Sequence, residues 1–262
     1  MILDLLINPR KEGKRLQLFF MGLFYSSIAI LISLWVFPAY VSIVMVFLCA
    51  ISAAPLINGI ISNEETKVKS SQDERWLIKE HSKVLSYFMF LFLGFTLSFT
   101  LWYLLMPGSE LFSIQTDTMK EKTTGDAVSS STVLLEIFYN NIKVLLFCMV
   151  FAFLFGIGSI FILSWNASVI GAAIGQFIVK GMSVSAFPLS LLRYFTHGLI
   201  EIGAYFAAGL AAGIISIAII RHDFGSKQFK HILMDSVDLT VLSVVLLAAA
   251  ALVEVYVTPM FF

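Results

Sequence analysis

Long uncharged runs constrain this chain more than any other feature. Of its 262 residues, 59% are hydrophobic and only 13% are charged, whereas an ordinary soluble domain has about 25% charged residues. A helix needs roughly 20 apolar residues to cross a bilayer. Uncharged runs of about this length are Leu16–Phe37, Tyr40–Ile61, Val84–Met106, Val144–Leu163 and Ile202–Ile220, and a sixth span, Leu239–Val257, carries only Glu254 near its end. The sequence therefore predicts an all-α, polytopic helical protein that spans the cell membrane several times.

A seventh apolar stretch is harder to interpret. Ala167–Val179 precedes Lys180 and Gly181, and as a helix it would measure only about 20 Å. We expect it to be a short or broken span, which gives six full spans and one incomplete one. The next segment, Pro188–Ile220, would form a helix about 50 Å long, so we expect part of it to tilt, break or lie flat.

The distribution of basic residues predicts the orientation. Lysine and arginine concentrate on the cytoplasmic side of membrane proteins. Most of these residues fall on one side if the N-terminus is cytoplasmic and the chain crosses seven times. This topology places the C-terminus outside and requires Ala167–Phe187 to cross.

The segments between the spans are expected to belong to a single integral membrane domain, 1–262. Residues 1–15 combine a short apolar segment with a basic cluster, which is typical of an interfacial helix. Residues 62–83 carry charges of both signs, so we expect a solvated, partly helical cytoplasmic hairpin. Residues 107–141 are predicted to be extracytoplasmic, with a mobile loop to residue 131 and an amphipathic segment, 133–141, lying on the membrane.

Charge and cysteine content exclude several classes of function. Lys plus Arg and Asp plus Glu are 17 each, which argues against nucleic acid as a partner. Cys49 and Cys148 are isolated within apolar runs, so no metal site or disulfide is predicted. No cofactor is predicted either, and the lipid bilayer is the one partner that composition identifies.

The best candidate site is a polar stripe. Arg193, His197 and Glu201 follow one another at four-residue spacing, which places them on one helix face. An ionised side chain at the bilayer centre costs about 2.5 to 3.5 kcal/mol, so these groups need water or partners inside the protein. The candidate partners are Asn140, Asn141 and Asn166.

Two interpretations of this stripe stay open. It lines a functional cavity, or it lies at the outer headgroup region, because Ile202–Ile220 alone is long enough to span. In both cases His197 is the group most suited to respond to pH.

Small residues indicate close helix packing. Gly171 and Gly175 form one small-xxx-small pair, and Gly209 and Gly213 form a second within an alanine-rich stretch. Such pairs let helix backbones approach each other in membranes. They do not distinguish packing within one chain from a homo-oligomer. Gly198, next to His197, is a further candidate for close packing.

No catalytic pattern is present in the sequence. His197 and Glu201 lack the second histidine of a zinc-protease helix, and no G-x-S-x-G, P-loop or dinucleotide fingerprint occurs. A non-enzymatic role is favoured.

Several motifs resemble the stage II sporulation protein M family. They are Phe138-Tyr139-Asn140-Asn141, Asn166 followed by Gly171, and His197-Gly198-Leu199-Ile200-Glu201 leading into an Ala/Gly-rich helix, so the similarity covers 136–220. Ala167 stands where the family often has glycine. The resemblance implies an integral membrane component that works with envelope partners, since members in endospore formers act beside peptidoglycan-degrading proteins.

Three functions are therefore considered. A membrane scaffold or complex subunit that acts in cell-envelope remodelling agrees best with the resemblance. The partners expected for it are membrane or envelope proteins, or further copies of this chain in a homo-oligomer. A transporter or permease subunit is the alternative, because interrupted helices and intramembrane charges recur at transport sites. An intramembrane hydrolase using His197 and Glu201 is the third hypothesis.

Overall fold

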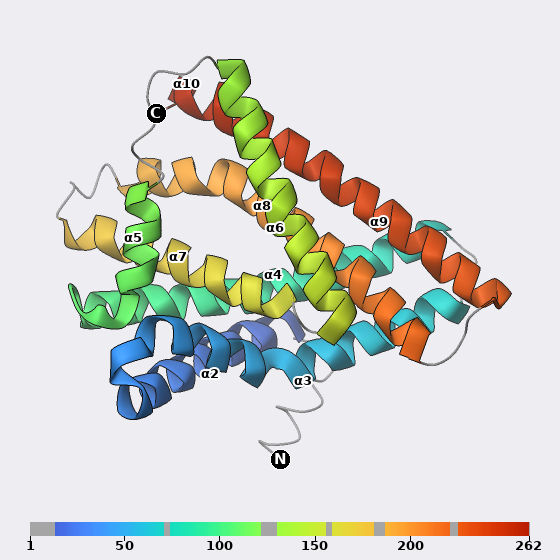
Figure 1. Cartoon of the computed structure of the whole chain (residues 1–262), viewed down its shortest axis with the longest axis horizontal. Coiled ribbons are helices and arrows are strands. Elements are labelled where there is room, and N and C mark those ends of the chain that lie inside the picture. Colours follow the sequence, from blue (N-terminus) through green and yellow to red (C-terminus); the bar gives the residue numbers. More distant parts are fainter. Residues whose placement is uncertain are drawn as a thin grey trace. The chain divides into compact units, whose positions relative to one another are not determined.

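The chain is built from helices (Figure 1). The computed structural model describes residues 14–70, 74–121, 130–155, 159–180, 187–220 and 225–261, and these contain no strand. Within them, seven helices are long and apolar enough to cross a membrane: Arg15–Val36, Pro38–Val68, Lys79–Leu105, Ser131–Leu154, Ile160–Val179, Thr196–Ile220 and Lys227–Met260. The prediction of an all-α polytopic membrane protein is confirmed, and the cytoplasmic N-terminus stays a prediction.

The helices follow one another with short connections. In chain order they are α2 (Lys14–Val36), the 3-10 turn η1 (Pro38–Tyr40), α3 (Val41–Ser70), α4 (Glu74–Leu105), the 3-10 turn η2 (Glu110–Phe112), α5 (Ser113–Glu121), α6 (Ser130–Phe155), α7 (Ser159–Val179), α8 (Phe187–Ile220), α9 (Lys227–Leu252), the π-helical turn η3 (Val253–Val257) and α10 (Thr258–Phe261). Pro38 ends the first helix, because its ring removes a backbone donor and favours the first position of a new turn.

These elements form two compact units. Unit 1 comprises Met1–Leu56, Ser86–Asp126 and Ile160–Phe187, and unit 2 comprises Ile57–Leu85, Ala127–Ser159 and Pro188–Phe262. Helices α3 and α4 each contribute one part to each unit. The predicted interfacial segment 1–15 lies almost entirely outside the described residues.

Glycines bring three helices of unit 1 together. A Cβ atom built on Gly94 of α4 would lie 2.1 Å from the carbonyl oxygen of Phe19, and one on Gly22 of α2 would lie 2.4 Å from that of Leu91. On α7, a Cβ at Gly171 would lie 2.7 Å from Phe99, and one at Gly175 would lie 2.6 Å from Tyr103. Only residues without side chains allow such backbone approach.

The segment after α4 is ordered within unit 1 as far as residue 121, so the prediction of a mobile loop is wrong there. Leu111 and Phe112 are buried, and the Phe112 ring lies 5.4 Å from that of Tyr103. The amide nitrogen of buried Gln115 donates to the Ser42 carbonyl oxygen at 3.0 Å and to the Ser168 hydroxyl at 3.2 Å. The sequence of this segment shows no clear helical periodicity, because it is held by only two buried apolar residues, Leu111 and Phe112. The buried residue that follows, Gln115, is polar and forms its hydrogen bonds inside the protein. Residues 122–129 lie outside the described part.

The bounds of α6 and α7 differ from three of the predicted segments. The predicted span Val144–Leu163 is divided, since α6 ends at Phe155 and α7 begins at Ser159. The predicted surface segment 133–141 is the first part of α6, and Ala167–Val179 is the second part of a full-length α7 rather than a broken span. The sequence between them is Gly156-Ile157-Gly158. Glycine is a weak helix former, a signal that a count of uncharged residues overlooks.

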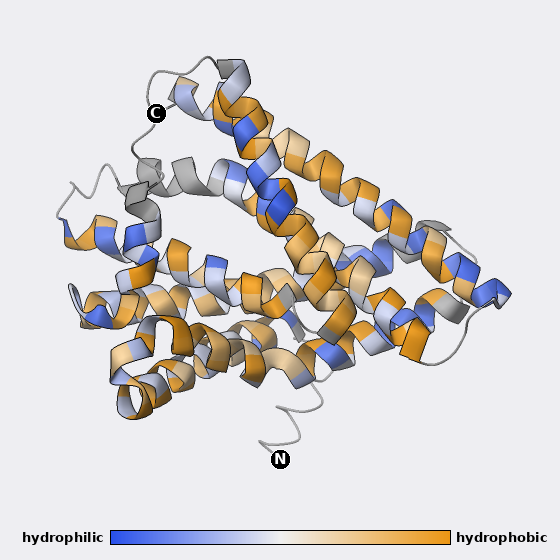
Figure 2. Ribbon diagram, in the orientation of Figure 1, coloured by the Kyte–Doolittle hydropathy of each residue, from blue (hydrophilic) through white to orange (hydrophobic). Residues whose placement is uncertain are grey.

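Unit 2 consists of α6, α8 and α9 with the adjoining ends of α3 and α4. Helix α8 supplies the small residues of its interior: Ala204, Ala207, Ala208, Gly209, Ala211, Ala212 and Gly213 are buried. Helix α9 continues without interruption through η3 into α10. Figure 2 shows hydrophilic residues gathered toward the start of α9, followed by a mostly hydrophobic helix.

Candidate functional site

Three polar side chains of α6 and α8 form a hydrogen-bonded group, here called the Glu201 network: Asn141, Glu201 and Tyr205. The Asn141 side-chain nitrogen donates to Glu201 Oε1, and the Tyr205 hydroxyl donates to Asn141 Oδ1 at 3.1 Å. Asn141 and Tyr205 are both buried. Because Asn141 offers donors at one atom and acceptors at the other, it links the carboxylate to the phenol and joins α6 to α8.

His197 lies one turn before Glu201 and contacts a different helix. Its Nε2 atom lies 4.0 Å from Glu254 Oε1, with side-chain exposures of 15% and 33%. The hydroxyls of Thr196 and Thr258 lie 3.5 Å apart beside this pair. Glu254 belongs to η3, and π-helical turns occur frequently at functional sites. This second group therefore joins α8 to the end of α9.

Of the remaining predicted site residues, Asn140 and Asn166 have side chains that the structure describes. Asn140 is exposed, and the Asn166 side chain in unit 1 donates to the Ile162 carbonyl oxygen of its own helix at 2.9 Å. Arg193 lies in α8, but its side chain is outside the described part of the structure. Among the residues that the structure describes, a Cβ built on Gly198 would meet nothing within 4 Å.

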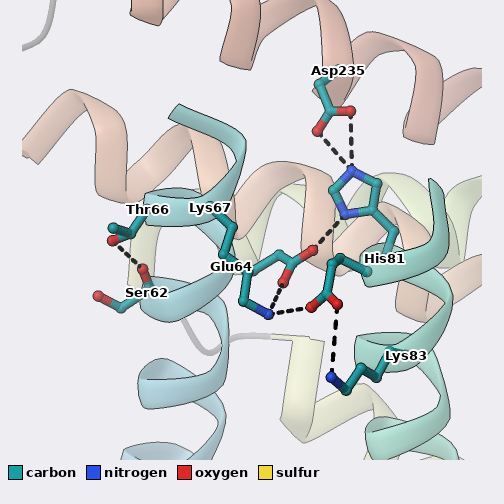
Figure 3. A network of polar contacts seen from close by, with 8 residues as sticks. Ser62, Glu64, Thr66, Lys67, His81, Lys83 and Asp235 are labelled. Atoms are coloured by element: carbon teal, nitrogen blue, oxygen red, sulfur yellow. Dashed lines mark hydrogen bonds and ion pairs between the residues drawn. The ribbon is translucent and has the colours of Figure 1, made fainter. Parts of the chain in front are cut away.

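A second polar network at the other end of α9 is the largest difference from the predicted site. His81 of α4 lies between Glu64 of α3 and Asp235 of α9 (Figure 3). Its Nδ1 atom is 2.8 Å from Glu64 Oε1, and its Nε2 atom is 2.9 Å from Asp235 Oδ2. The side chains of Glu64, His81 and Asp235 are 1%, 6% and 12% exposed. We call these three residues the His81 clamp.

The clamp has a specific requirement for donors. Ionised carboxylates only accept hydrogen bonds, whereas a neutral imidazole has one donor and an imidazolium has two. Carboxylate oxygens on both sides of the ring are therefore satisfied together by the imidazolium. Two charge-assisted hydrogen bonds then connect three helices in a buried position.

Ion pairs surround the clamp and extend it. Lys67 forms an ion pair with Glu80, and its Nζ atom is 3.5 Å from Glu64 Oε2. Lys83 Nζ is 3.7 Å from Glu80 Oε1. Glu65 is fully buried next to Glu64. The carboxylates of this end are thus turned inward and share a small number of cations.

Within residues 62–83, part of the charge that was expected to be solvated lies inside the protein. The helical character is as expected, but Glu64, Glu65 and His81 are buried, and Glu64 pairs with His81 across the hairpin. One signal was available in the sequence: Glu64 with His81 and Lys67 with Glu80 lie almost symmetrically about the turn, as pairs in an antiparallel hairpin do. The contribution of Asp235 had no local signal.

Neither network resembles a metal site. No group of three or more His, Cys, Asp or Glu that could hold a metal ion is found among the residues that the structure describes. Cys49 and Cys148 are buried, each in a separate unit. What the two networks offer chemically is hydrogen bonds and charge–charge attraction between helices.

Comparisons with known proteins agree with this description. Residues 84–259 match the family described as Stage II sporulation protein M. An uncharacterized protein of Methanocaldococcus jannaschii is 27% identical over 125 residues, which cover 46% of this chain and 67% of that protein. No solved structure matches. The match covers more than half of the sequence and includes α6, α8 and α9. The chain belongs to the stage II sporulation protein M family of membrane proteins.

Proposed function

We propose that this protein is a non-enzymatic subunit or scaffold of a membrane complex that acts in cell-envelope remodelling. One observation carries the proposal: three of the candidate groups, Asn141, Glu201 and His197, lie against polar partners on neighbouring helices. Asn141 is engaged by both Glu201 and Tyr205, and His197 faces Glu254. Contacts of this kind favour one arrangement of the helices that carry them.

The physical reason lies in the surroundings of these groups. Helices in a bilayer gain little from hydrophobic association, so packing and interhelical hydrogen bonds decide how they pair. A closed network such as Asn141, Glu201 and Tyr205 favours one arrangement of α6 against α8. A fixed arrangement of helix ends and loops is what a partner protein requires for recognition.

Crosslinking in native membranes tests the proposal. We expect the wild-type protein to be recovered with a defined envelope protein, and a variant carrying Asn141→Leu and Glu201→Leu to lose that partner while still inserting into the membrane. Asn140→Leu is the matched control, because Asn140 is exposed, and it should keep the partner. A wild-type protein that is recovered alone under all crosslinking conditions would contradict the proposal.

A second candidate is a transporter subunit, and η3 is the observation that favours it. This π-helical turn lies inside the last candidate span and carries Glu254 toward His197. Helix irregularities beside intramembrane charges recur in transporters. Proton flux into liposomes containing the purified protein, read with a trapped pH-sensitive dye, would support this candidate only if His197→Ala and Glu254→Gln abolish it.

A further inference from the structure

At the end of unit 2 that contains the His81 clamp, the described carboxylates and lysines differ in burial. Four carboxylates are buried or nearly so: Glu64 and Glu65 are buried, and the side chains of Glu80 and Asp235 are only 14% and 12% exposed. Four lysines of the same helix ends are exposed instead: Lys79, Lys83, Lys227 and Lys230. We call these four residues the lysine rim. Asp238 is the exposed carboxylate of these helix ends in the part that the structure describes.

The lysine rim lies at the end of unit 2 where α4 and α9 meet. His81 and Asp235 are in contact, so α4 and α9 meet there. Lys79 and Lys83 lie within about one helical turn of His81, and Lys227 lies about 12 Å from Asp235 along the axis of α9. The rim lysines therefore lie on the parts of α4 and α9 next to the clamp.

On α4 and α9, the rim lysines mark a boundary between polar and apolar surface. Beyond Lys83, α4 continues without a charged residue to its end at Leu105. On α9, the rim is followed by exposed apolar side chains at Leu233, Met234 and Val237. Ammonium groups directly beside an exposed apolar surface fit a phospholipid, which presents a phosphate next to its acyl chains.

Local helix stability does not explain two of these lysines. Lys227 and Lys230 lie in or next to the first turn of α9, which contains no acidic residue. The helix macrodipole favours anions rather than cations at this position. An anion from outside the chain would compensate this unfavourable placement.

We propose that the lysine rim binds the headgroups of anionic phospholipids in the leaflet that it borders. The bound class is a phosphate monoanion attached to acyl chains, held by ammonium groups on α4 and α9. The two carboxylates of the clamp oppose this binding less than free carboxylates would, because both contact His81 and Lys67 lies 3.5 Å from Glu64.

Native mass spectrometry of the delipidated full-length protein tests the proposal. The probes are phosphatidylglycerol and phosphatidylcholine with identical acyl chains, and inorganic phosphate at matched concentration. We expect the wild type to prefer phosphatidylglycerol and a variant with all four rim lysines changed to glutamine to lose this preference, by about fivefold for each lysine. Replacement of the four lysines by arginine should retain it.

Lys143→Gln is the matched control, since Lys143 is exposed on α6 and stacks over the Tyr139 ring; it should leave the preference unchanged. If the fourfold glutamine variant does not fold, the pairs Lys79→Gln with Lys83→Gln and Lys227→Gln with Lys230→Gln are measured separately, and each should lower the preference. An unchanged preference in the glutamine variants, or competition by inorganic phosphate as strong as by the lipid, would overturn the proposal.

Discussion

The two polar networks of unit 2 differ in charge, burial and reach. The His81 clamp places one imidazole between two carboxylates from two other helices, with all three side chains at most 12% exposed. The Glu201 network joins two helices through a buried asparagine and tyrosine, and the neighbouring pair His197 and Glu254 is more exposed and 4.0 Å apart. The first is a buried charge cluster, whereas the second lies next to a pair of more exposed side chains.

This difference indicates different roles. Buried charges are costly, and removing one partner leaves the others without compensation. The clamp therefore holds α3, α4 and α9 in one arrangement. The Glu201 network contains two uncharged side chains, Asn141 and Tyr205. The loss of one of its hydrogen bonds therefore costs less than the loss of a charge from the clamp, and the network stabilises the arrangement of α6 against α8 less strongly.

The networks also differ in their relation to the family. The family match begins at residue 84, so it contains Asn141, Glu201 and Asp235 but not Glu64 or His81. The clamp thus fastens the preceding hairpin to α9 of the matched region. Asp235 and Glu254 lie about 28 Å apart along the continuous α9 and η3, close to the thickness of a bilayer core.

Removal of the central imidazole should have the largest effect. We expect His81→Ala to lower the free energy of unfolding by about 3 to 5 kcal/mol, because Glu64 and Asp235 would remain buried without a cation between them. The measurement is an SDS titration in mixed micelles. Ser82→Ala, at an exposed neighbouring position, is the control, and equal effects of both variants would show that the clamp does not stabilise the fold.

Loss of the carboxylate in the Glu201 network should have a smaller effect. Glu201→Leu removes the acceptor of the Asn141 amide, so we expect a loss of about 1 to 3 kcal/mol in the free energy of unfolding. Glu201→Gln keeps a carbonyl acceptor and should retain most of the stability. A cost of Glu201→Leu equal to that of His81→Ala would remove the distinction between the two networks.

The tyrosine of the same network provides a finer test. Tyr205→Phe deletes one hydrogen bond to Asn141 and should cost about 1 kcal/mol. In a double-mutant cycle with Asn141→Leu, the two effects should be less than additive, because both remove the same bond. Strict additivity would mean that the bond does not contribute to stability.

The smallest effect is expected at the more exposed pair. His197 and Glu254 are partly exposed at 4.0 Å, and exposed pairs contribute about 0 to 1 kcal/mol. His197→Ala and Glu254→Gln should therefore change the SDS midpoint only slightly. A loss as large as that of Tyr205→Phe would place this pair among the stabilising contacts.

Hydropathy predicted the helical membrane class and the number of candidate spans, because both depend on local composition. It failed at the charged hairpin, where helices α3 and α4 continue beyond the apolar runs and bury Glu64 against His81. It also failed at Gln115, whose partners Ser42 and Ser168 are distant in sequence. His197, Glu201 and Asn141 were found because their charge or amide interrupts an apolar run, whereas Tyr205 and Glu254 were missed as interfacial residues.

The separation of about 28 Å between Asp235 and Glu254 predicts that the two networks lie at opposite faces of the membrane, and cysteine labelling tests this prediction most directly. Ser82 is exposed beside the clamp and Glu136 is exposed on α6 before Asn141, while the native Cys49 and Cys148 are buried. In intact cells, a membrane-impermeant maleimide should label Glu136→Cys at once and Ser82→Cys only after permeabilisation. Labelling of both variants from the same side would contradict the prediction.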